Sequence, residues 1–192
     1  MDIFEEFRRY RQKEQELAWT GTFAEYVELV RKNPNIARTA HARVYDMIVW
    51  HGVTEENGHK KYRFFENEIF GLDRTLERLV EEYFHSAAKR LDVRKRILLL
   101  MGPVSGGKST IVTMLKRGLE RYTRTPEGAL YAIKGCPMYE EPLHLIPKEM
   151  RPTVEKELGV AIEGNLCPSC QMMLKTEYDC DIEHVMVERI VL

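Results

Sequence analysis

The 192-residue sequence has almost no net charge, because 29 lysine and arginine residues nearly balance 30 aspartate and glutamate residues. A basic excess is typical of proteins that bind nucleic acid or a membrane surface, so we expect neither as a partner. No apolar run is long enough to span a membrane, and the first residues contain no apolar signal-peptide core. The composition therefore predicts a cytoplasmic globular protein with mixed secondary structure.

Cysteine is scarce, with four residues in the chain, which excludes a scaffold held together by disulfides. Cys167 and Cys170 form a C-x-x-C pair, which is half of a zinc site such as a zinc knuckle. Structural zinc, buried thiols and a redox-active pair all remain open as interpretations of this pair. Side chains elsewhere in the sequence could supply further zinc ligands: Cys136, Cys180, His144 and His184.

One stretch carries a specific chemical signal, an apolar run followed by a glycine-rich turn. Residues 97–101 are all apolar and make up the length of a short strand, which predicts a buried strand of a parallel sheet. Residues 102–109 then match the phosphate-binding pattern G-x-x-x-x-G-K-[ST] at every fixed position. We therefore predict a P-loop NTPase fold of the α/β class, with a parallel sheet flanked by helices.

The residue types of this P-loop explain its chemistry. Gly102, Gly106 and Gly107 allow positive φ angles and a close approach of the backbone, so that successive N–H groups point at phosphate oxygens. Lys108 can reach the β- and γ-phosphates of ATP, and the Ser109 hydroxyl is placed to bind Mg²⁺. The predicted ATP-binding residues of the loop are Gly102, Pro103, Val104, Ser105, Gly106, Gly107, Lys108, Ser109 and Thr110.

Residues 1–60 are predicted to form a small helical module, in which Thr22 and Glu25 make a capping box at the start of one helix. The hydrophilic turn near residue 58 marks a boundary, so residues 61–192 are predicted to form a separate nucleotide-binding domain. The chain stops after the β-prone residues 184–192 with no helix or cap. We therefore expect a truncated form of that domain.

Three further segments of the predicted nucleotide-binding domain have simple interpretations. Apolar residues recur at three- and four-residue spacing after Asp73, which predicts a helix capped by Asp73 and packed on the sheet. Residues 129–133 predict another strand. The adjacent Glu140 and Glu141 lie in a proline-rich loop, where we expect solvated side chains rather than a catalytic pair.

Five longer motifs extend beyond the P-loop itself: residues 65–73 (FENEIFGLD), 100–109 (LMGPVSGGKS), 131–138 (YAIKGCPM), 141–147 (EPLHLIP) and 163–170 (EGNLCPSC). With these motifs the chain resembles, nearly end to end, the N-terminal part of the bacterial PrkA family of serine protein kinases. The resemblance implies an AAA-type ATPase core in which Ile69, Phe70 and Gly71 line the adenine pocket. Ser105 departs from the family, which often has glycine there, but this loop position requires only an N–H group and modest bulk.

The resemblance implies ATP-dependent phosphoryl transfer to protein serine, so the first hypothesis is the ATP-binding N-terminal part of a serine protein kinase. The second is an AAA-type remodeller or ATP-dependent protease subunit, acting on a protein client as a ring-shaped homo-oligomer. The third is a non-catalytic nucleotide-binding fragment. We recognise no H-R-D or D-F-G motif, acidic strand end, sensor or arginine finger in the sequence, so we expect this chain alone to lack catalytic competence.

Overall fold

A computed structural model describes residues 3–89, 98–103 and 106–192 of the chain. The chain divides into two compact units, one formed by Met1–Ala37 with Thr123–Leu192 and the other by Arg38–Tyr122. We refer to them as the discontinuous unit and the central unit. The predicted boundary near residue 60 lies within the central unit, and the division into a helical module and a nucleotide-binding domain stays a prediction.

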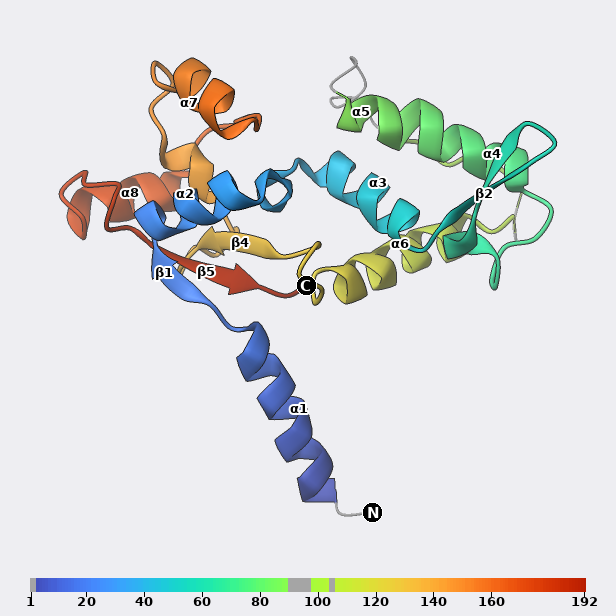
Figure 1. The fold of residues 1–192 in the computed structure, drawn as a ribbon, viewed down its shortest axis with the longest axis horizontal. Coiled ribbons are helices and arrows are strands. Elements are labelled where there is room, and N and C mark those ends of the chain that lie inside the picture. Colours follow the sequence, from blue (N-terminus) through green and yellow to red (C-terminus); the bar gives the residue numbers. More distant parts are fainter. Residues whose placement is uncertain (1–2, 90–97, 104–105) are drawn as a thin grey trace. The chain divides into compact units, whose positions relative to one another are not determined.

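The discontinuous unit combines a small sheet with several short helices (Figure 1). In chain order, its elements are α1 (Ile3–Leu17), β1 (Thr20–Thr22), α2 (Phe23–Lys32), η1 (Pro34–Ala37), β4 (Leu130–Ile133), η4 (Pro142–Leu145), α7 (Arg151–Leu158), α8 (Pro168–Thr176) and β5 (Met186–Ile190).

The central unit is mainly helical and has one β-hairpin (Figure 1). In chain order, its elements are α3 (Ala40–Trp50), β2 (Val53–Glu56), β3 (His59–Tyr62), η2 (Arg63–Phe65), α4 (Asp73–Arg78), the π-helical η3 (Leu79–His85), α5 (Ser86–Ala88) and α6 (Lys108–Tyr122).

The sheet of the discontinuous unit is antiparallel and has the strand order β1–β5–β4. Val187 of the central strand β5 lies opposite Gly21 of β1 on one side and Ile133 of β4 on the other. Val187 and Ile133 are both buried, because helices and loops of the unit cover them. The strands predicted near residue 130 and near the end of the chain are therefore confirmed.

The parallel sheet that we predicted is not observed in the part of the chain that the structure describes. All strand pairs there are antiparallel, and none includes residues 98–101. Leu99 and Met101 are 72% and 81% exposed, whereas a parallel strand is covered on both faces and paired at both edges. Ile97 lies outside the described residues. What the structure supports is a mixed α/β fold.

Helix α2 begins at the predicted capping box, which the structure confirms. The Thr22 hydroxyl accepts a hydrogen bond from the Glu25 backbone N–H at 3.3 Å, and the Glu25 carboxylate accepts one from the Thr22 N–H at 2.8 Å. The helix then buries Phe23, Tyr26 and Val30 in the core of the discontinuous unit. These two bonds satisfy N–H groups that the first helical turn cannot pair internally.

In the central unit, α4, η3 and α5 follow one another along the predicted apolar helix. The side chains of Leu76, Val80, Phe84 and Ala87 are buried at three- and four-residue spacing, which confirms the amphipathic pattern. The prediction that Asp73 caps this helix is wrong. Asp73 is the first helical residue, where its negative charge instead complements the N-terminal end of the helix dipole.

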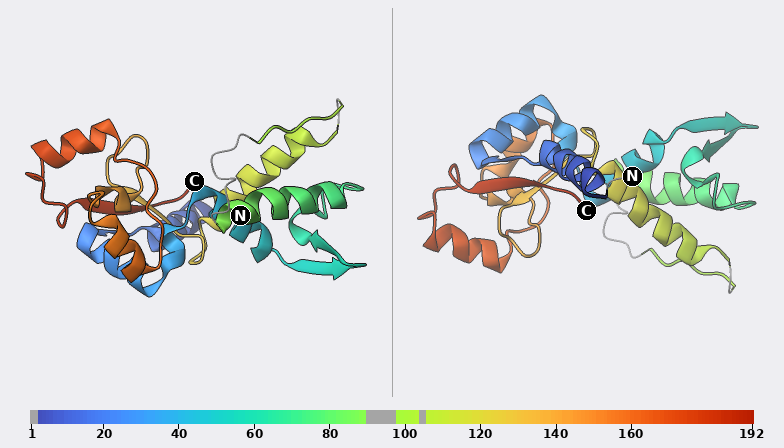
Figure 2. Two further views of the ribbon diagram at one scale, coloured as in Figure 1. Left: turned by 90° about the horizontal axis from the view of Figure 1, so that it is seen from above. Right: turned by 90° about the horizontal axis from the view of Figure 1, so that it is seen from below.

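Strands β2 and β3 form a hairpin that lies along α4 (Figure 2). Its two-residue turn consists of Asn57 and Gly58, with positive φ angles of 53° and 76°. Asn-Gly is favoured at such turns, because both central residues of a type I′ turn need positive φ. The hydrophilic segment that we predicted as a boundary is thus a hairpin turn within the central unit.

Helix α6 follows the glycine-rich loop and packs into the core of the central unit. Its buried positions include Ile111, Met114 and Gly118. A Cβ atom at Gly118 would lie 2.7 Å from the Met47 sulfur and 2.7 Å from the Phe64 ring, so glycine permits close packing here. Among the described residues, no helix is both long and apolar enough to cross a membrane.

We expect Thr22→Ala to lower the free energy of unfolding by about 1 kcal/mol, because it removes the side-chain oxygen that caps α2. Urea unfolding followed by circular dichroism measures the change. Thr22→Ser is the matched control, since it keeps the capping oxygen. Equal losses in the two variants would show that the cap does not account for the stability of α2.

Candidate nucleotide-binding site

The glycine-rich loop leads directly into a helix, as the P-loop pattern predicts. Helix α6 begins at Lys108, and its first turn closes with a hydrogen bond of 2.9 Å from the Ile111 N–H to the Gly107 carbonyl. Gly107 has a φ of 76°, a left-handed conformation that favours glycine. The N–H groups of the first turn have no carbonyl partner within the helix, so they are available to an anion.

The loop is compact in front of this helix. The Gly106 N–H donates to the Pro103 carbonyl at 3.2 Å. A Cβ atom at position 106 would approach the same oxygen to 3.0 Å, closer than a side chain normally sits to backbone. Glycine at this position therefore allows the tight loop. Val104 and Ser105, which we also predicted as ATP-binding residues, lie outside the described residues.

The Lys108 ammonium group is held by the loop itself. Its Nζ donates to the Gly102 carbonyl at 2.8 Å and to the Pro103 carbonyl at 2.5 Å. Hydrogen bonds between an ammonium group and a phosphate involve two opposite charges and are stronger than bonds to neutral carbonyl oxygens. The lysine can therefore exchange these two partners for phosphate oxygens.

The loop and the predicted adenine-binding segment line the same cavity. This cavity has a volume of about 640 Å³ and contacts Ile69 and Phe70 on one side and the start of α6 on the other. Ile69 is buried, whereas the Phe70 ring is 78% exposed. Two sequence segments separated by more than thirty residues thus meet. Their shared lining comprises Glu68, Ile69, Phe70, Leu72, Gly106, Gly107, Lys108, Ser109 and Thr110.

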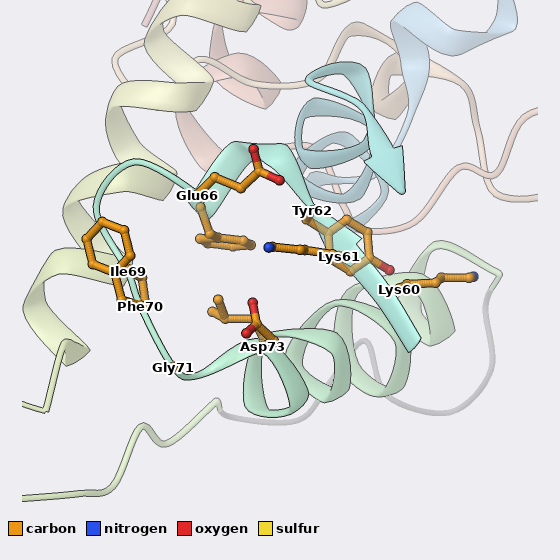
Figure 3. A pocket seen from close by; sticks show the side chains of 10 residues that line it. Lys60, Lys61, Tyr62, Glu66, Ile69, Phe70, Gly71 and Asp73 are labelled. Carbon is orange, nitrogen blue, oxygen red and sulfur yellow. The ribbon is translucent and has the colours of Figure 1, made fainter. Parts of the chain in front are cut away.

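A second, smaller pocket of about 330 Å³ lies next to this segment, between β3 and the start of α4 (Figure 3). Ile69, Phe70 and Gly71 line it, and the first two of these residues also line the larger cavity. Figure 3 shows the Lys61 side chain and the Asp73 carboxylate extending into the pocket. Charged residues of both signs therefore line this pocket beside an apolar wall.

Charged residues other than Lys108 also line these hollows, and they were not among the predicted site residues. Glu68 is acidic and lines the larger cavity beside the P-loop residues, and Lys61 and Asp73 line the smaller one. Glu68 and Asp73 lie beside residues 69–71 in the sequence, and this position was the available signal. Charged residues before and after an apolar segment are too common for that signal to be specific.

A network centred on Glu81 supports the wall of the smaller pocket. The Glu81 carboxylate accepts hydrogen bonds from the Tyr62 hydroxyl at 2.5 Å and from Lys60 Nζ at 2.8 Å, and it lies 2.6 Å from His85 Nδ1. Partial burial disfavours the charged carboxylate, but the bonds from Lys60, Tyr62 and His85 outweigh this and lower the pKa of Glu81 to about 2. Burial, followed by the bond to Glu81, raises the pKa of Tyr62.

Three of the four cysteines of the discontinuous unit form a cluster of thiol groups. The thiols of Cys136, Cys167 and Cys170 all lie within 4.8 Å of one another. Of the additional ligands considered from the sequence, only Cys136 joins the pair within the described residues. Cys180 is exposed, and His184 is hydrogen-bonded to Asp181. His144 contacts Glu140 and the Glu163 carbonyl, both at 2.5 Å.

The expectation that Glu140 and Glu141 are solvated is wrong. Glu140 lies 2.5 Å from the His144 ring and accepts a hydrogen bond from the Cys167 N–H at 2.9 Å. Glu141 accepts one from the Tyr26 hydroxyl at 2.8 Å. Both carboxylates therefore hold the proline-rich loop against other parts of the discontinuous unit, a role that depends on contacts between residues distant in the sequence.

A glycine-rich loop, a lysine and a helix N-terminus around one cavity define the class of P-loop nucleotide-binding proteins. The model of the PrkA AAA domain family matches residues 21–192. The chain therefore belongs to this family, as the sequence motifs indicated. The family assignment supports the P-loop NTPase fold.

Curated relatives agree with this assignment. The chain is 62% identical, over 190 residues, to the "ATP-dependent protease PrkA" of Bacillus subtilis; this covers 99% of the chain and 30% of that protein. It is 61% identical, over 97 residues, to the whole of an "Uncharacterized protein in gldA 5'region" of Geobacillus stearothermophilus, which covers 50% of the chain.

A more distant relative is the "Serine/threonine kinase YeaG" of Escherichia coli strain K12. The two are 34% identical over 104 residues, which covers 52% of the chain and 15% of that protein. The chain thus spans less than a third of the length of the B. subtilis and E. coli relatives. No solved structure matches the chain significantly.

The lowered pKa of Glu81 predicts a stability difference that depends on pH. The pKa of this carboxylate is near 2 in the folded chain and about 4.3 in the unfolded chain. The ionised carboxylate therefore stabilises the fold at pH values above about 4.3. This stabilisation is lost as the pH falls toward 2. We therefore expect Glu81→Gln to be less stable than the wild type at pH 7, with a difference that shrinks between about pH 4 and about pH 2.

Urea unfolding at a series of pH values measures this difference. Glu82→Gln is the control, because Glu82 forms an exposed ion pair with Arg78 that contributes little to stability. Parallel stability curves for the wild type and Glu81→Gln across the acidic range would show that the network does not depend on the ionised carboxylate.

Proposed function

We propose that the chain binds ATP with Mg²⁺ in the cavity between the glycine-rich loop and residues 69–71. The observation that carries this proposal is that Lys108, the loop backbone and an exposed aromatic ring line one space of about 640 Å³. Ligand sites in proteins typically enclose about 300–1,000 Å³. The cavity therefore has a size and a set of groups that suit a nucleoside triphosphate.

Each part of the cavity has a distinct role in this proposal. Lys108 and the N–H groups at the start of α6 bind the phosphates, and the Ser109 hydroxyl, which is exposed on the first turn of α6, binds Mg²⁺. Ile69, Phe70 and the backbone at Gly71 bind the adenine ring. Mg²⁺ neutralises part of the phosphate charge and fixes the orientation of the phosphate chain.

We further propose that the longer protein uses ATP to act on a protein substrate. The relative with 62% identity is named an ATP-dependent protease, which favours coupling of ATP hydrolysis to work on a protein client, with ring-shaped homo-oligomers. The relative with 34% identity is named a serine/threonine kinase, which favours phosphoryl transfer to a protein hydroxyl. Both activities need ATP bound at this site. We propose that the longer protein acts in the cytoplasm.

These two activities of the longer protein have different products. Incubation of the full-length protein with ATP labelled at the γ-phosphate and with candidate protein substrates distinguishes them. Kinase activity transfers the label to protein, whereas protease activity releases inorganic phosphate and shortens the substrate. The isolated chain is expected to bind ATP without hydrolysing it.

We expect Lys108→Ala to weaken ATP binding by about 10- to 100-fold, because each hydrogen bond to a charged group contributes about 1.5–3 kcal/mol. Titration of the 192-residue chain with a fluorescent ATP analogue and Mg²⁺ measures the affinity. Lys116→Ala is the matched control, since Lys116 is an exposed lysine further along α6. Unchanged affinity in Lys108→Ala would refute the phosphate-binding role.

Phe70→Ala should weaken ATP binding by about 5- to 100-fold, because stacking of a base on an aromatic ring contributes about 1–3 kcal/mol. Competition with inorganic triphosphate separates the two halves of the site. We expect Phe70→Ala to leave triphosphate binding unchanged and Lys108→Ala to weaken it. Equal loss of ATP and triphosphate binding in Phe70→Ala would place the base elsewhere.

A further inference from the structure

Two separate segments of the discontinuous unit bring three cysteines together. Cys136 follows β4, and Cys167 and Cys170 belong to the first turn of α8. Their Sγ atoms lie within 4.8 Å of one another, and the Cys136 and Cys167 sulfurs are 3.7 Å apart. Cys136 and Cys170 are buried, and Cys167 is half-buried.

The spacing of the sulfurs suits a metal ion better than a disulfide. With a zinc–sulfur distance of about 2.3 Å, a tetrahedral site holds its sulfur atoms about 3.8 Å apart. The observed 3.7 Å between the Cys136 and Cys167 sulfurs agrees with this value. A disulfide needs about 2.05 Å between the two sulfurs.

The backbone around the cluster is arranged to support thiolates. Cys136 and Cys167 are each followed by a proline, whose fixed φ favours the start of a tight turn. In the first turn, the N–H groups of Met138 and Glu140 donate to the Cys136 sulfur. In the second, the Cys170 N–H donates to the Cys167 sulfur at 3.4 Å. Such bonds to ligand atoms orient and stabilise metal sites.

Glu140 connects the two segments. Its N–H donates to the Cys136 sulfur, and its carboxylate accepts the Cys167 N–H at 2.9 Å. The Glu140 side chain is only 11% exposed. A single residue therefore fixes the turn that carries Cys136 relative to the turn that carries Cys167, and the three thiols converge.

The electrostatics of the cluster call for a cation. The sulfur atoms of the three cysteines lie within 4.8 Å of one another, and two of the three residues are buried. Several thiolates this close repel one another unless a divalent cation compensates their charge, and thiolate sulfur is a preferred ligand of zinc.

We propose that Cys136, Cys167 and Cys170 bind one Zn²⁺ ion as thiolates, with a water molecule as the fourth ligand. Binding releases the thiol protons to solvent and fixes the turn after β4 to the start of α8. Half-buried Cys167 gives the water access to the site. The proposal does not depend on nucleotide binding, because the P-loop belongs to the central unit.

Metal analysis of the full 192-residue chain, purified under reducing conditions, tests the proposal. We expect about one zinc per chain in the wild type and in Cys180→Ser, whose cysteine is exposed and outside the cluster. Cys136→Ser, Cys167→Ser and Cys170→Ser should each lose most of the zinc. Retention of zinc by all three variants would overturn the proposed ligand set.

Cobalt titration of the metal-free wild type gives a second test that needs no substitution. Coordination by three thiolates should produce strong thiolate-to-cobalt charge-transfer absorption, which Zn²⁺ then displaces. Absence of this absorption in folded protein would overturn the proposal. So would a native disulfide between Cys136 and Cys167, detected by mass spectrometry of the protein as purified, because it would leave too few thiolates.

Discussion

Pairing of β5 with strands on both of its edges determines the arrangement of the discontinuous unit. On one edge the N-terminal β1 forms the ladder, and the Phe23 N–H donates to the Val185 carbonyl at 2.8 Å as α2 begins. On the other edge the ladder continues past β4, where the Lys134 N–H donates to the Met186 carbonyl at 2.9 Å. Segments from both ends of the chain therefore share one core, and the turn that carries Cys136 starts from a fixed position.

At the candidate site of the central unit, the backbone conformation of the glycine-rich loop determines how the chain enters α6. Left-handed Gly107 turns the chain into α6, and Lys108 bonds to carbonyl oxygens of its own loop. These two bonds hold the ammonium group of Lys108 against the loop. In the proposed complex with ATP, phosphate oxygens replace these carbonyl oxygens as stronger partners of Lys108.

The two candidate sites show different relations between sequence and chemistry. The phosphate-binding loop is local, because its glycines, lysine and serine are consecutive and the helix that follows presents their N–H groups. The thiol cluster is not local, since Cys136 lies 31 residues before Cys167. Only contacts such as that of Glu140 with the Cys167 N–H bring its two parts together.

The sequence by itself determined the features that depend on neighbouring residues. These are the capping box of α2, the amphipathic pattern after Asp73, the strand at β4 and the helix α6 directly after the glycine-rich loop. Backbone dihedrals and side-chain periodicity act over a few residues, so a local pattern is sufficient to predict them.

Only the tertiary structure decided which strands pair and which side chains meet. The apolar run at residues 97–101 suggested a parallel sheet, but a strand also needs partners, and the described strand pairs are antiparallel. Sequence spacing alone could not identify Cys136 as the third thiol of the cysteine cluster. It also could not predict that Glu140 contacts the Cys167 N–H. Such choices depend on the packing of distant segments, which places side chains together that no local pattern connects.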